Sequence, residues 1–217
     1  MTGTAPAARI RDAERSRLAI LDSAEALFAA RGFDGTSLSD IGAAAGLSRA
    51  TPSYFYGSKE RLYTAVLEHV FAERQAATAR AFEPVHEWCA GDGGRAALAT
   101  ALARATEAYM GFLVQRPAFV RLLAWEELSS AQRLRSARRS STAMRDAFGA
   151  LRTVAPARGL RAFDPGDAVL VFVSLTFGPL AQRSTLMAGI GRDLSDDAQL
   201  TRHVDLVVDQ VMRLLGA

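Results

Sequence analysis

Residues 38–59 read LSDIGAAAGLSRATPSYFYGSK, and this stretch decides the fold of the chain. The pattern predicts a short helix, a tight turn at Gly46, a second short helix, and then the start of a new helix at Ser58. Two helices joined by a turn of a few residues that contains glycine form a helix-turn-helix. Because such a unit places its second helix in the major groove of DNA, the stretch predicts a DNA-binding element.

The segment before this motif predicts a first, amphipathic helix. Its apolar residues recur at the spacing of one helix face: Ile20, Leu21, Ala24, Leu27 and Phe28. The helix is expected to end at Arg31 and Gly32, since a basic last turn followed by glycine is typical of a helix C-terminus. Together with the motif, this helix makes a three-helix unit.

Capping residues mark the starts of the helices that follow. Ser37 is followed three residues later by Asp40, which is close to a capping box. Ser48 is expected to cap the second helix of the motif. Ser58 is expected to cap a long helix that reaches about residue 82.

The second helix of the motif carries side chains suited to DNA. Arginine can pair bidentately with guanine, and threonine can donate, accept or touch a thymine methyl group. Serine and tyrosine hydroxyls can reach phosphate oxygens, and a lysine in the first turn of the next helix lies where free N–H groups favour an anion. The residues of this kind are Arg49, Ala50, Thr51, Ser53, Tyr54 and Lys59. The alternative is a polar turn between packed helices that binds no ligand.

Pro52 leaves two starts open for this helix. Proline lacks an N–H and clashes with the carbonyl four residues back. If the helix starts at Arg49, Pro52 removes its first hydrogen bond. If Thr51 is the cap, Pro52 occupies the favoured first helical position.

Several short motifs together resemble the DNA-binding domain of the TetR family of bacterial transcriptional regulators. They are Ala26-Leu27-Phe28 with Gly32-Phe33, Thr36-Ser37-Leu38-Ser39-Asp40-Ile41, Ala45-Gly46-Leu47-Ser48, and Ser58-Lys59-Glu60 with Leu62. The resemblance covers roughly the first third of the chain. It implies a homodimeric repressor, or less often an activator, that a small ligand releases from operator DNA.

The resemblance also implies roles for single residues. By position, Arg49, Thr51 and Tyr54 fall where the family reads DNA, and Ser37 and Lys59 fall where it grips phosphates. The chain departs from the commonest pattern, in which a tyrosine stands at the position of Ser53 and an aliphatic residue at that of Pro52. The full set expected to contact DNA is Ser37, Ser48, Arg49, Ala50, Thr51, Ser53, Tyr54 and Lys59.

Composition fits a cytoplasmic regulator. The 217 residues are 49% hydrophobic, which is enough for one or two domains with a sizeable core. The single cysteine, Cys89, forms no internal disulfide, and neither a signal peptide nor an apolar run of about 20 residues is evident. The net charge is +3, and residues 1–82 carry ten basic and nine acidic side chains. The prediction of DNA binding therefore depends on where individual side chains lie in the motif and not on the overall charge.

The remaining sequence predicts helices only. We expect them over residues 95–115, 118–128, 130–154, 167–188 and 196–215. The predicted fold class is therefore all-α, with a helix-turn-helix domain over residues 15–75 (motif 38–57) and a helical effector-binding and dimerisation domain over residues 76–217. Residues 1–14 are expected to form a flexible basic arm that reaches DNA, or else a solvated tail.

The last two helices are the candidates for dimerisation. Residues 169–177 are apolar almost all round, and a helix of that kind must be buried on several sides. In the TetR-like interpretation the two helices pair with those of a second subunit. The residues expected in that interface are Leu175, Val204, Val208 and Val211. The alternative is a pair of core helices in a monomer.

Aromatic and apolar residues of the middle helices are the candidates for an effector pocket, because ligand sites are mostly apolar. They are Tyr109, Phe112, Leu113, Trp125, Met144, Phe148 and Phe172. The alternative is ordinary core, and the pocket itself is implied by the resemblance. His86 and Cys89 lack a second half-site for zinc, so we expect no metal and no cofactor.

Two other function classes stay open in the sequence. An all-helical enzyme is disfavoured, because no phosphate-binding loop, nucleophile elbow or H-E-x-x-H motif occurs. A DNA-binding adaptor controlled by a partner protein fits the same motifs. The leading hypothesis is a homodimer whose partners are double-stranded operator DNA and a small, largely apolar effector.

Overall fold

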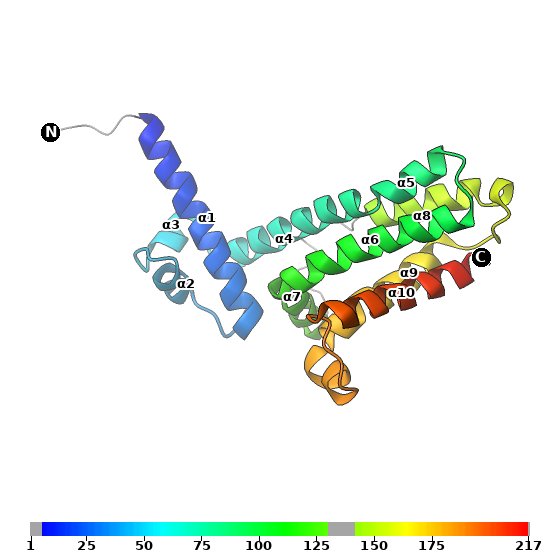
Figure 1. Ribbon diagram of the computed structural model, residues 1–217. Helices are drawn as coiled ribbons and strands as arrows, with labels where there is room; N and C mark the ends of the chain where they lie inside the picture. Colours follow the sequence, from blue (N-terminus) through cyan, green and yellow to red (C-terminus); the bar gives the residue numbers. More distant parts are fainter. Residues whose placement is uncertain (1–5, 130–141, 217) are drawn as a thin grey trace. The chain divides into compact units, whose positions relative to one another are not determined.

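The computed structural model describes residues 6–129 and 142–216, and every regular element in these ranges is helical (Figure 1). The prediction of an all-α fold is confirmed. The α-helices are α1 (Pro6–Arg31), α2 (Leu38–Ala44), α3 (Thr51–Tyr56), α4 (Lys59–Ala81), α5 (Glu83–Ala90), α6 (Arg95–Gln115), α7 (Pro117–Leu128), α8 (Thr142–Val154), α9 (Pro165–Ala181) and α10 (Asp197–Leu214). A 3₁₀ turn, Pro156–Arg158, and a π-helix, Arg183–Met187, follow α8 and α9.

The described helices agree with the predicted ones in most places. The helix over 95–115 is α6, and the start expected at residue 130 lies outside the described residues. Helix α5 was not predicted, and the sequence signal for it is Pro84 in its first turn, a position that proline favours. Residues 6–14, expected in a flexible arm, are the first turns of α1, because the segment is rich in good helix formers and contains no glycine.

The chain divides into two compact units. The first holds residues 6–70 and 121–129 of the described chain, and the second holds residues 71–120 and 142–216. Helix α4 crosses this division between residues 70 and 71, and α7 crosses it between residues 120 and 121. The sequence placed the boundary between residues 75 and 76 and assigned all of α7 to the second domain.

The first unit has a core formed by α1, α2 and α4. Ile20, Phe28, Ile41 and Leu62 have no exposed surface. The rings of Phe28 and Tyr63 meet edge to face, with their centroids 4.8 Å apart. Burying apolar side chains of this size stabilises a fold by about 1.5–3 kcal/mol each, so these contacts hold the three helices together.

The C-terminal half of α7 completes this core. The hydroxyl of Tyr63 donates a 2.8 Å hydrogen bond to Oε1 of Glu126, whose side chain is 1% exposed. The indole Nε1 of Trp125 donates to the carbonyl oxygen of Ala29 over 3.2 Å. Gly32 has a φ of +69°, and a Cβ there would lie 3.2 Å from the Trp125 ring, so both its backbone and its neighbour favour glycine.

The second unit has an aromatic core. The ring of Phe172 on α9 packs against three other rings, with centroid distances of 5.2 Å to Phe82, 5.7 Å to Tyr109 and 6.1 Å to Phe148. All four side chains are almost fully buried. The sequence led us to expect a helix buried on several sides, but only the face with Ala168, Phe172 and Thr176 is buried, and Leu170 is 65% exposed. No described helix of the chain has the length and apolar character needed to cross a bilayer.

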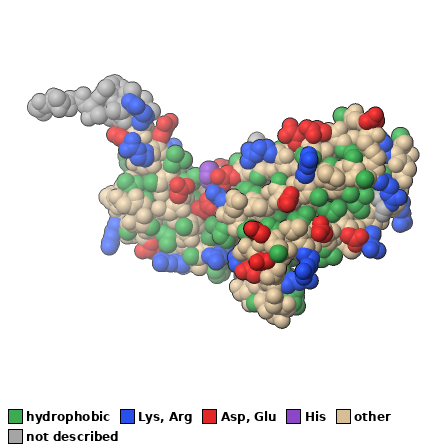
Figure 2. All heavy atoms as spheres, in the orientation of Figure 1, with side chains coloured by type: hydrophobic (Ala, Val, Ile, Leu, Met, Phe, Trp, Pro, Cys, Tyr) green, Lys and Arg blue, Asp and Glu red, His purple; other side chains and the backbone are tan. Residues whose placement is uncertain are grey.

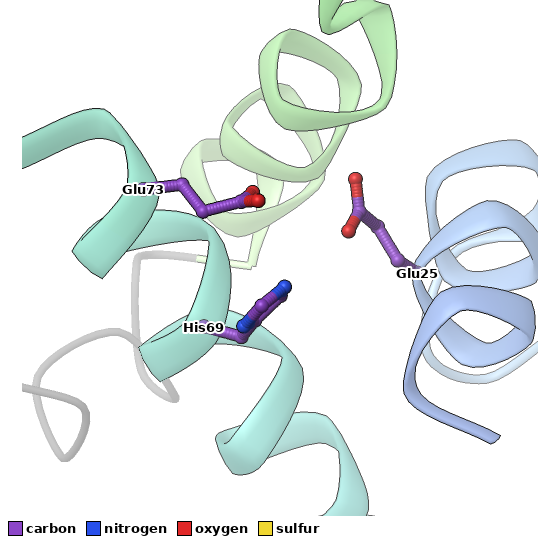
Figure 3. Close-up of side chains that lie close together, drawn as sticks. All are labelled: Glu25, His69 and Glu73. Atoms are coloured by element: carbon purple, nitrogen blue, oxygen red, sulfur yellow. The ribbon is translucent and has the colours of Figure 1, made fainter. Parts of the chain in front are cut away.

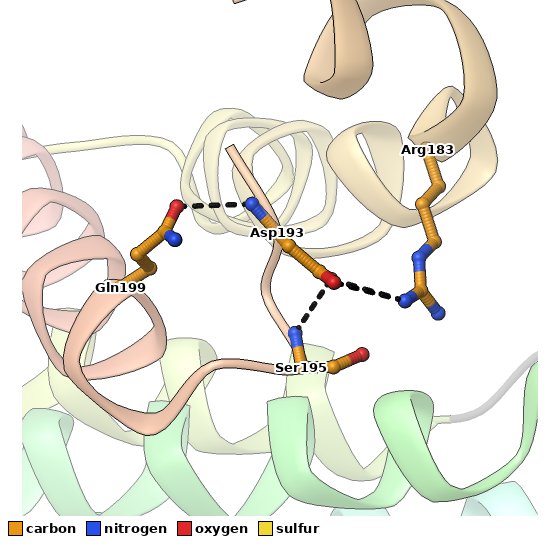
Figure 4. A network of polar contacts seen from close by, with 4 residues as sticks. All are labelled: Arg183, Asp193, Ser195 and Gln199. Carbon is orange, nitrogen blue, oxygen red and sulfur yellow. Dashed lines mark hydrogen bonds and ion pairs between the residues drawn. The ribbon is translucent and has the colours of Figure 1, made fainter. Parts of the chain in front are cut away.

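A polar network closes the segment between α9 and α10 (Figure 4). The carboxylate of Asp193 accepts hydrogen bonds from the guanidinium of Arg183 at 3.0 Å and from the N–H of Ser195 at 2.9 Å. The N–H of Asp193 donates to the side-chain oxygen of Gln199 over 2.9 Å. In the same segment, Met187 and Leu194 are buried in a small apolar cluster with Met110 and Val204, so apolar packing and polar contacts both stabilise it.

Replacing Tyr63 by phenylalanine is expected to lower the free energy of unfolding by about 1–3 kcal/mol, because the buried carboxylate of Glu126 loses a donor. The matched control is Tyr56→Phe, which removes a longer, exposed hydrogen bond of 3.3 Å to the carbonyl of Arg17. Urea unfolding of both variants measures the difference. Equal midpoints for the two variants would contradict the role of the Tyr63–Glu126 hydrogen bond.

Candidate nucleic-acid interface

Helix α2 begins with the predicted capping box. The side chain of Ser37 accepts a hydrogen bond from the N–H of Asp40 at 3.1 Å, and the carboxylate of Asp40 accepts from the N–H of Ser37 at 3.3 Å. The Ser37 hydroxyl also donates to that carboxylate over 2.7 Å. These hydrogen bonds lower the pKa of Asp40 below its ordinary value of 3.8, so the carboxylate stabilises the fold above this pH and loses that contribution as the pH falls further.

The turn of the motif depends on a close approach at Gly42. A Cβ on this glycine would lie 2.7 Å from the carbonyl oxygen of Ser48 and 3.2 Å from Cδ of Pro52. Real Cβ atoms do not come so near to backbone, so a larger residue would force α2 and α3 apart. Gly46 in the turn has a φ of +68°, a conformation that glycine adopts without strain.

Helix α3 begins at Thr51, with Ala50 at the cap and no side-chain capping bond. Pro52 is therefore the second helical residue, so its missing N–H is one of the groups that have no partner within a helix in any case. The sequence left a start at Arg49 or a cap at Thr51 open, and the structure has neither. Pro52 is also buried, and it lies close to Gly42 of α2. The expectation that Ser48 caps this helix is wrong, since its hydroxyl bonds instead to that of Thr51 at 2.7 Å.

Helix α3 presents a polar face to solvent. The side chain of Tyr54 is 84% exposed, the largest value among the exposed large hydrophobic residues of the described chain. Arg49, Ala50 and Ser53 are also exposed, and Thr51 is half-buried. Most of the residues predicted to contact DNA in and just before this helix are therefore accessible to solvent.

Neighbouring residues fix both ends of this surface. Ser58 caps α4 by accepting a hydrogen bond from the N–H of Arg61 at 3.3 Å. The Lys59 ammonium lies 4.3 Å from the centroid of the Phe33 ring, a cation–π contact that orients it in the first turn of α4. The guanidinium of Arg17 lies 5.4 Å from the ring centroid of Phe55, a contact between α1 and α3 that the sequence did not predict.

The residues expected in an effector pocket fall into both units. Trp125 belongs to the first unit, where its indole bonds to the backbone of α1. The other candidates belong to the second unit, and all but the half-buried Phe112 are buried in its core: Tyr109, Leu113, Met144, Phe148 and Phe172. The sequence predicted one pocket from these residues because each lies on an apolar face of a predicted helix, and this pattern does not show which unit a residue belongs to.

The residues expected in a dimer interface differ in exposure. Val204 and Val211 are 4% and 1% exposed, because they pack inside their own unit. Leu175 and Val208 are half-buried. Two apolar residues on the same helices are more accessible, Leu170 at 65% and Leu206 at 41%.

Glu25 of α1 and His69 of α4 form a close polar pair in the first unit (Figure 3). A carboxylate oxygen of Glu25 and an imidazole nitrogen of His69 lie within 4.8 Å of each other. Glu73 follows one turn later on α4 and forms an ion pair with Arg116. Within the first unit, Glu25 and His69 make a polar contact between α1 and α4.

Comparisons with known proteins match both parts of the chain. Residues 20–66 match the family model for bacterial regulatory proteins of the tetR family, and residues 99–211 match the model of a tetracyclin repressor-like C-terminal domain. The chain is 27% identical to the HTH-type transcriptional repressor NicS of Pseudomonas putida, over 94% of each protein. It is 38% identical over 52 residues to IcaR of Staphylococcus epidermidis, a negative transcriptional regulator of a biofilm operon.

Solved structures share the fold. A TetR family regulator from Marinobacter aquaeolei superimposes with a TM-score of 0.64 at 20% identity, covering 95% of this chain and 98% of the other. PfmR from Thermus thermophilus, of the same family, superimposes with a TM-score of 0.60 at 20% identity, covering 90% and 98%.

The Ser37→Ala variant is expected to lose about 1 kcal/mol of stability at pH 7, because the first turn of α2 loses its cap. The matched control is Ser39→Ala, one position inside the same helix and half-buried. Thermal unfolding at pH 7 and at pH 3 measures both variants. The loss at Ser37 should be smaller at pH 3, because the share that depends on the Asp40 carboxylate decreases as the pH falls below 3.8, and a constant loss would contradict the coupling.

Proposed function

Because this chain belongs to the TetR family of bacterial regulatory proteins, we propose that it is a homodimeric repressor that a small effector releases from operator DNA. The DNA-binding part rests on one observation, the exposed polar face of α3 on a helix that Gly42 and Pro52 lock against α2. A helix held in this way keeps its side chains at a defined position for base contacts. The repressors NicS and IcaR, to which the chain is similar, support the sign of regulation.

We assign the DNA contacts by exposure and chemistry. Arg49 is exposed beside the start of α3 and supplies the planar donor pair that recognises guanine. Tyr54 and Ser53 supply hydroxyls to phosphate oxygens, as does Ser37 from the exposed start of α2. Lys59 supplies a charge to the backbone, which positions the protein without reading sequence.

The proposed dimer uses α9 and α10 of each subunit. The imidazole Nε2 of His203 on α10 lies 2.7 Å from the carbonyl oxygen of Leu175 on α9, so a polar contact links the two helices. Apolar side chains gather over α6 and α10 on the face seen in Figure 2. We place Leu170 and Leu206 in the contact with the second subunit, together with Leu175 and Val208, since Val204 and Val211 are already covered.

Dimerisation gives the DNA contacts their geometry. Two reading helices related by a two-fold axis bind half-sites centred about 34 Å apart on the duplex. An effector can bind more tightly to a dimer whose reading helices have a different spacing than to the dimer that fits the operator. The difference between these two binding free energies is the amount by which the effector lowers operator affinity. Helix α4 is the proposed lever, because only two residues separate it from α3 and it continues into the second unit.

Membership of the family also supports a proposal about catalysis and a proposal about localisation. We propose that the chain has no catalytic role and works in the cytoplasm, where operator DNA is found. Support comes from the two family matches, which together cover the DNA-binding motif and most of the C-terminal helices.

The Arg49→Ala variant is expected to weaken binding to the selected operator by about 1–3 kcal/mol while binding to random DNA changes little. The operator is first selected from random duplexes with the purified protein. Fluorescence anisotropy at two salt concentrations then measures both affinities. Arg31→Ala, which removes an exposed charge from the last turn of α1, is the matched control. Equal losses on operator and random DNA would contradict base reading by Arg49.

The Leu206→Arg variant is expected to raise the dissociation constant of the dimer by about a hundredfold or more, because an unpaired charge is then buried between subunits. Sedimentation equilibrium measures the monomer fraction. Leu18→Arg makes the same change at a residue of α1 that is 57% exposed and lies in the first unit. An unchanged dimer in Leu206→Arg would place the subunit contact elsewhere.

A further inference from the structure

Arg74 on α4 is a partly buried cation in the aromatic part of the second unit. The carbon of its guanidinium lies 5.4 Å from the ring centroid of Phe71 and 5.9 Å from that of Phe119. Its Nε atom is buried and has no hydrogen-bond partner among the described residues. Rings of this kind attract the charge of the guanidinium, but they accept no N–H bond in the plane of the group.

No ion pair between described residues includes Arg74. The adjacent carboxylate, Glu73, is paired with Arg116. Every aspartate and glutamate of the chain lies within the described ranges, because residues 1–5, 130–141 and 217 contain none. The protein itself therefore supplies no carboxylate to Arg74.

Such an arrangement is unfavourable for the free protein. Arginine stays charged in proteins, and a buried donor without an acceptor destabilises the fold by the cost of removing it from water. Groups that reduce stability in this way are concentrated at binding sites, where a ligand completes them. Arg74 is thus a candidate for contact with an anion.

The residues near Arg74 indicate which groups a ligand needs besides its negative charge. Burial raises the pKa of Tyr109, while the charge and hydrogen bonding of Arg74 act against this rise, so the phenol is protonated at neutral pH and can donate a second hydrogen bond. The ring of Phe119 is 6.0 Å from that of Phe112 and 6.5 Å from that of Phe177, measured between centroids. Phe112 and Phe177 are half-buried, which leaves part of their surface for a flat apolar group.

From these contacts we propose that Arg74 binds the carboxylate of a small aromatic monocarboxylic acid, with Tyr109 as a second donor and the rings around Phe119 as the surface for its aromatic body. A planar guanidinium fits the two oxygens of a carboxylate. One uncompensated positive charge matches a single negative charge, which favours a monocarboxylate over a phosphate dianion. The inference names the effector class of the proposed repressor and rests on that function.

The test uses full-length protein and a panel of probes. Benzoate, 1-naphthoate and 2-naphthoate are compared with their carboxamides, which keep the ring and lack the charge. The variants are Arg74→Met, which keeps an unbranched apolar side chain and removes the guanidinium, and Arg80→Met, which removes an exposed arginine from the same helix. Thermal unfolding and titration calorimetry are measured for each pair of protein and probe.

We expect at least one carboxylate to raise the melting temperature of the wild-type protein and its amide to leave it unchanged. The Arg74→Met variant should bind that carboxylate about tenfold or more weakly, as expected when one charge-assisted contact is lost, and Arg80→Met should bind it like the wild type. The proposal is overturned if no carboxylate of the panel binds, if an amide binds as well as its acid, or if Arg74→Met binds like the wild type.

Operator binding separates this inference from the function on which it rests. An operator complex that forms normally in a protein that binds none of the acids contradicts the Arg74 site and leaves the repressor in place. An acid that binds through Arg74 without weakening the operator complex supports the site and contradicts effector release. Anisotropy of labelled operator DNA, with and without the acid, distinguishes the two results.

Discussion

The approach of α2 to the start of α3 is the constraint on which the DNA-binding surface depends. Helix α3 has six residues, far fewer than a helix needs to be stable by itself in water. Its position therefore comes from packing, with Pro52 buried and Gly42 leaving room for the backbone of Ser48. The same packing leaves Arg49 and Tyr54 exposed, so the contact that stabilises the helix also orients the side chains proposed to bind DNA.

The first unit is completed by a segment far away in the sequence. Glu126 and Trp125 of α7 bond to Tyr63 of α4 and Ala29 of α1, and they do so in a core where an unpaired polar group is costly. Helices α4 and α7 thus each contribute residues to both units. A ligand that shifts α4 or α7 in the second unit therefore acts on a helix that continues into the DNA-binding unit. This continuity is the physical basis for the proposal that α4 transmits the effect of a ligand.

The second unit combines a tightly packed centre with one uncompensated charge. Phe172 is surrounded by three aromatic neighbours, which is the environment expected for a residue that serves stability. Arg74 lies beside Phe71 and Phe119 and has a buried Nε without an acceptor, which does not serve stability. Residues of this second kind are better guides to a ligand than the aromatic rings alone, because aromatic side chains on an apolar helix face are mostly core.

The sequence by itself determined the fold class, the capping box at Ser37, the helix-turn-helix and the family resemblance, because caps, glycine turns and helical periodicity depend on residues near one another in the chain. It did not determine that Ala50 caps α3, that Trp125 belongs with the DNA-binding core, that Val204 and Val211 are covered within their own unit, or that the buried Nε of Arg74 has no acceptor among the described residues. Each of these depends on which side chains from distant segments meet. Burial and pairing are set by that three-dimensional packing, and a pattern along one helix is the same whether its apolar face meets the core, a second subunit or a ligand.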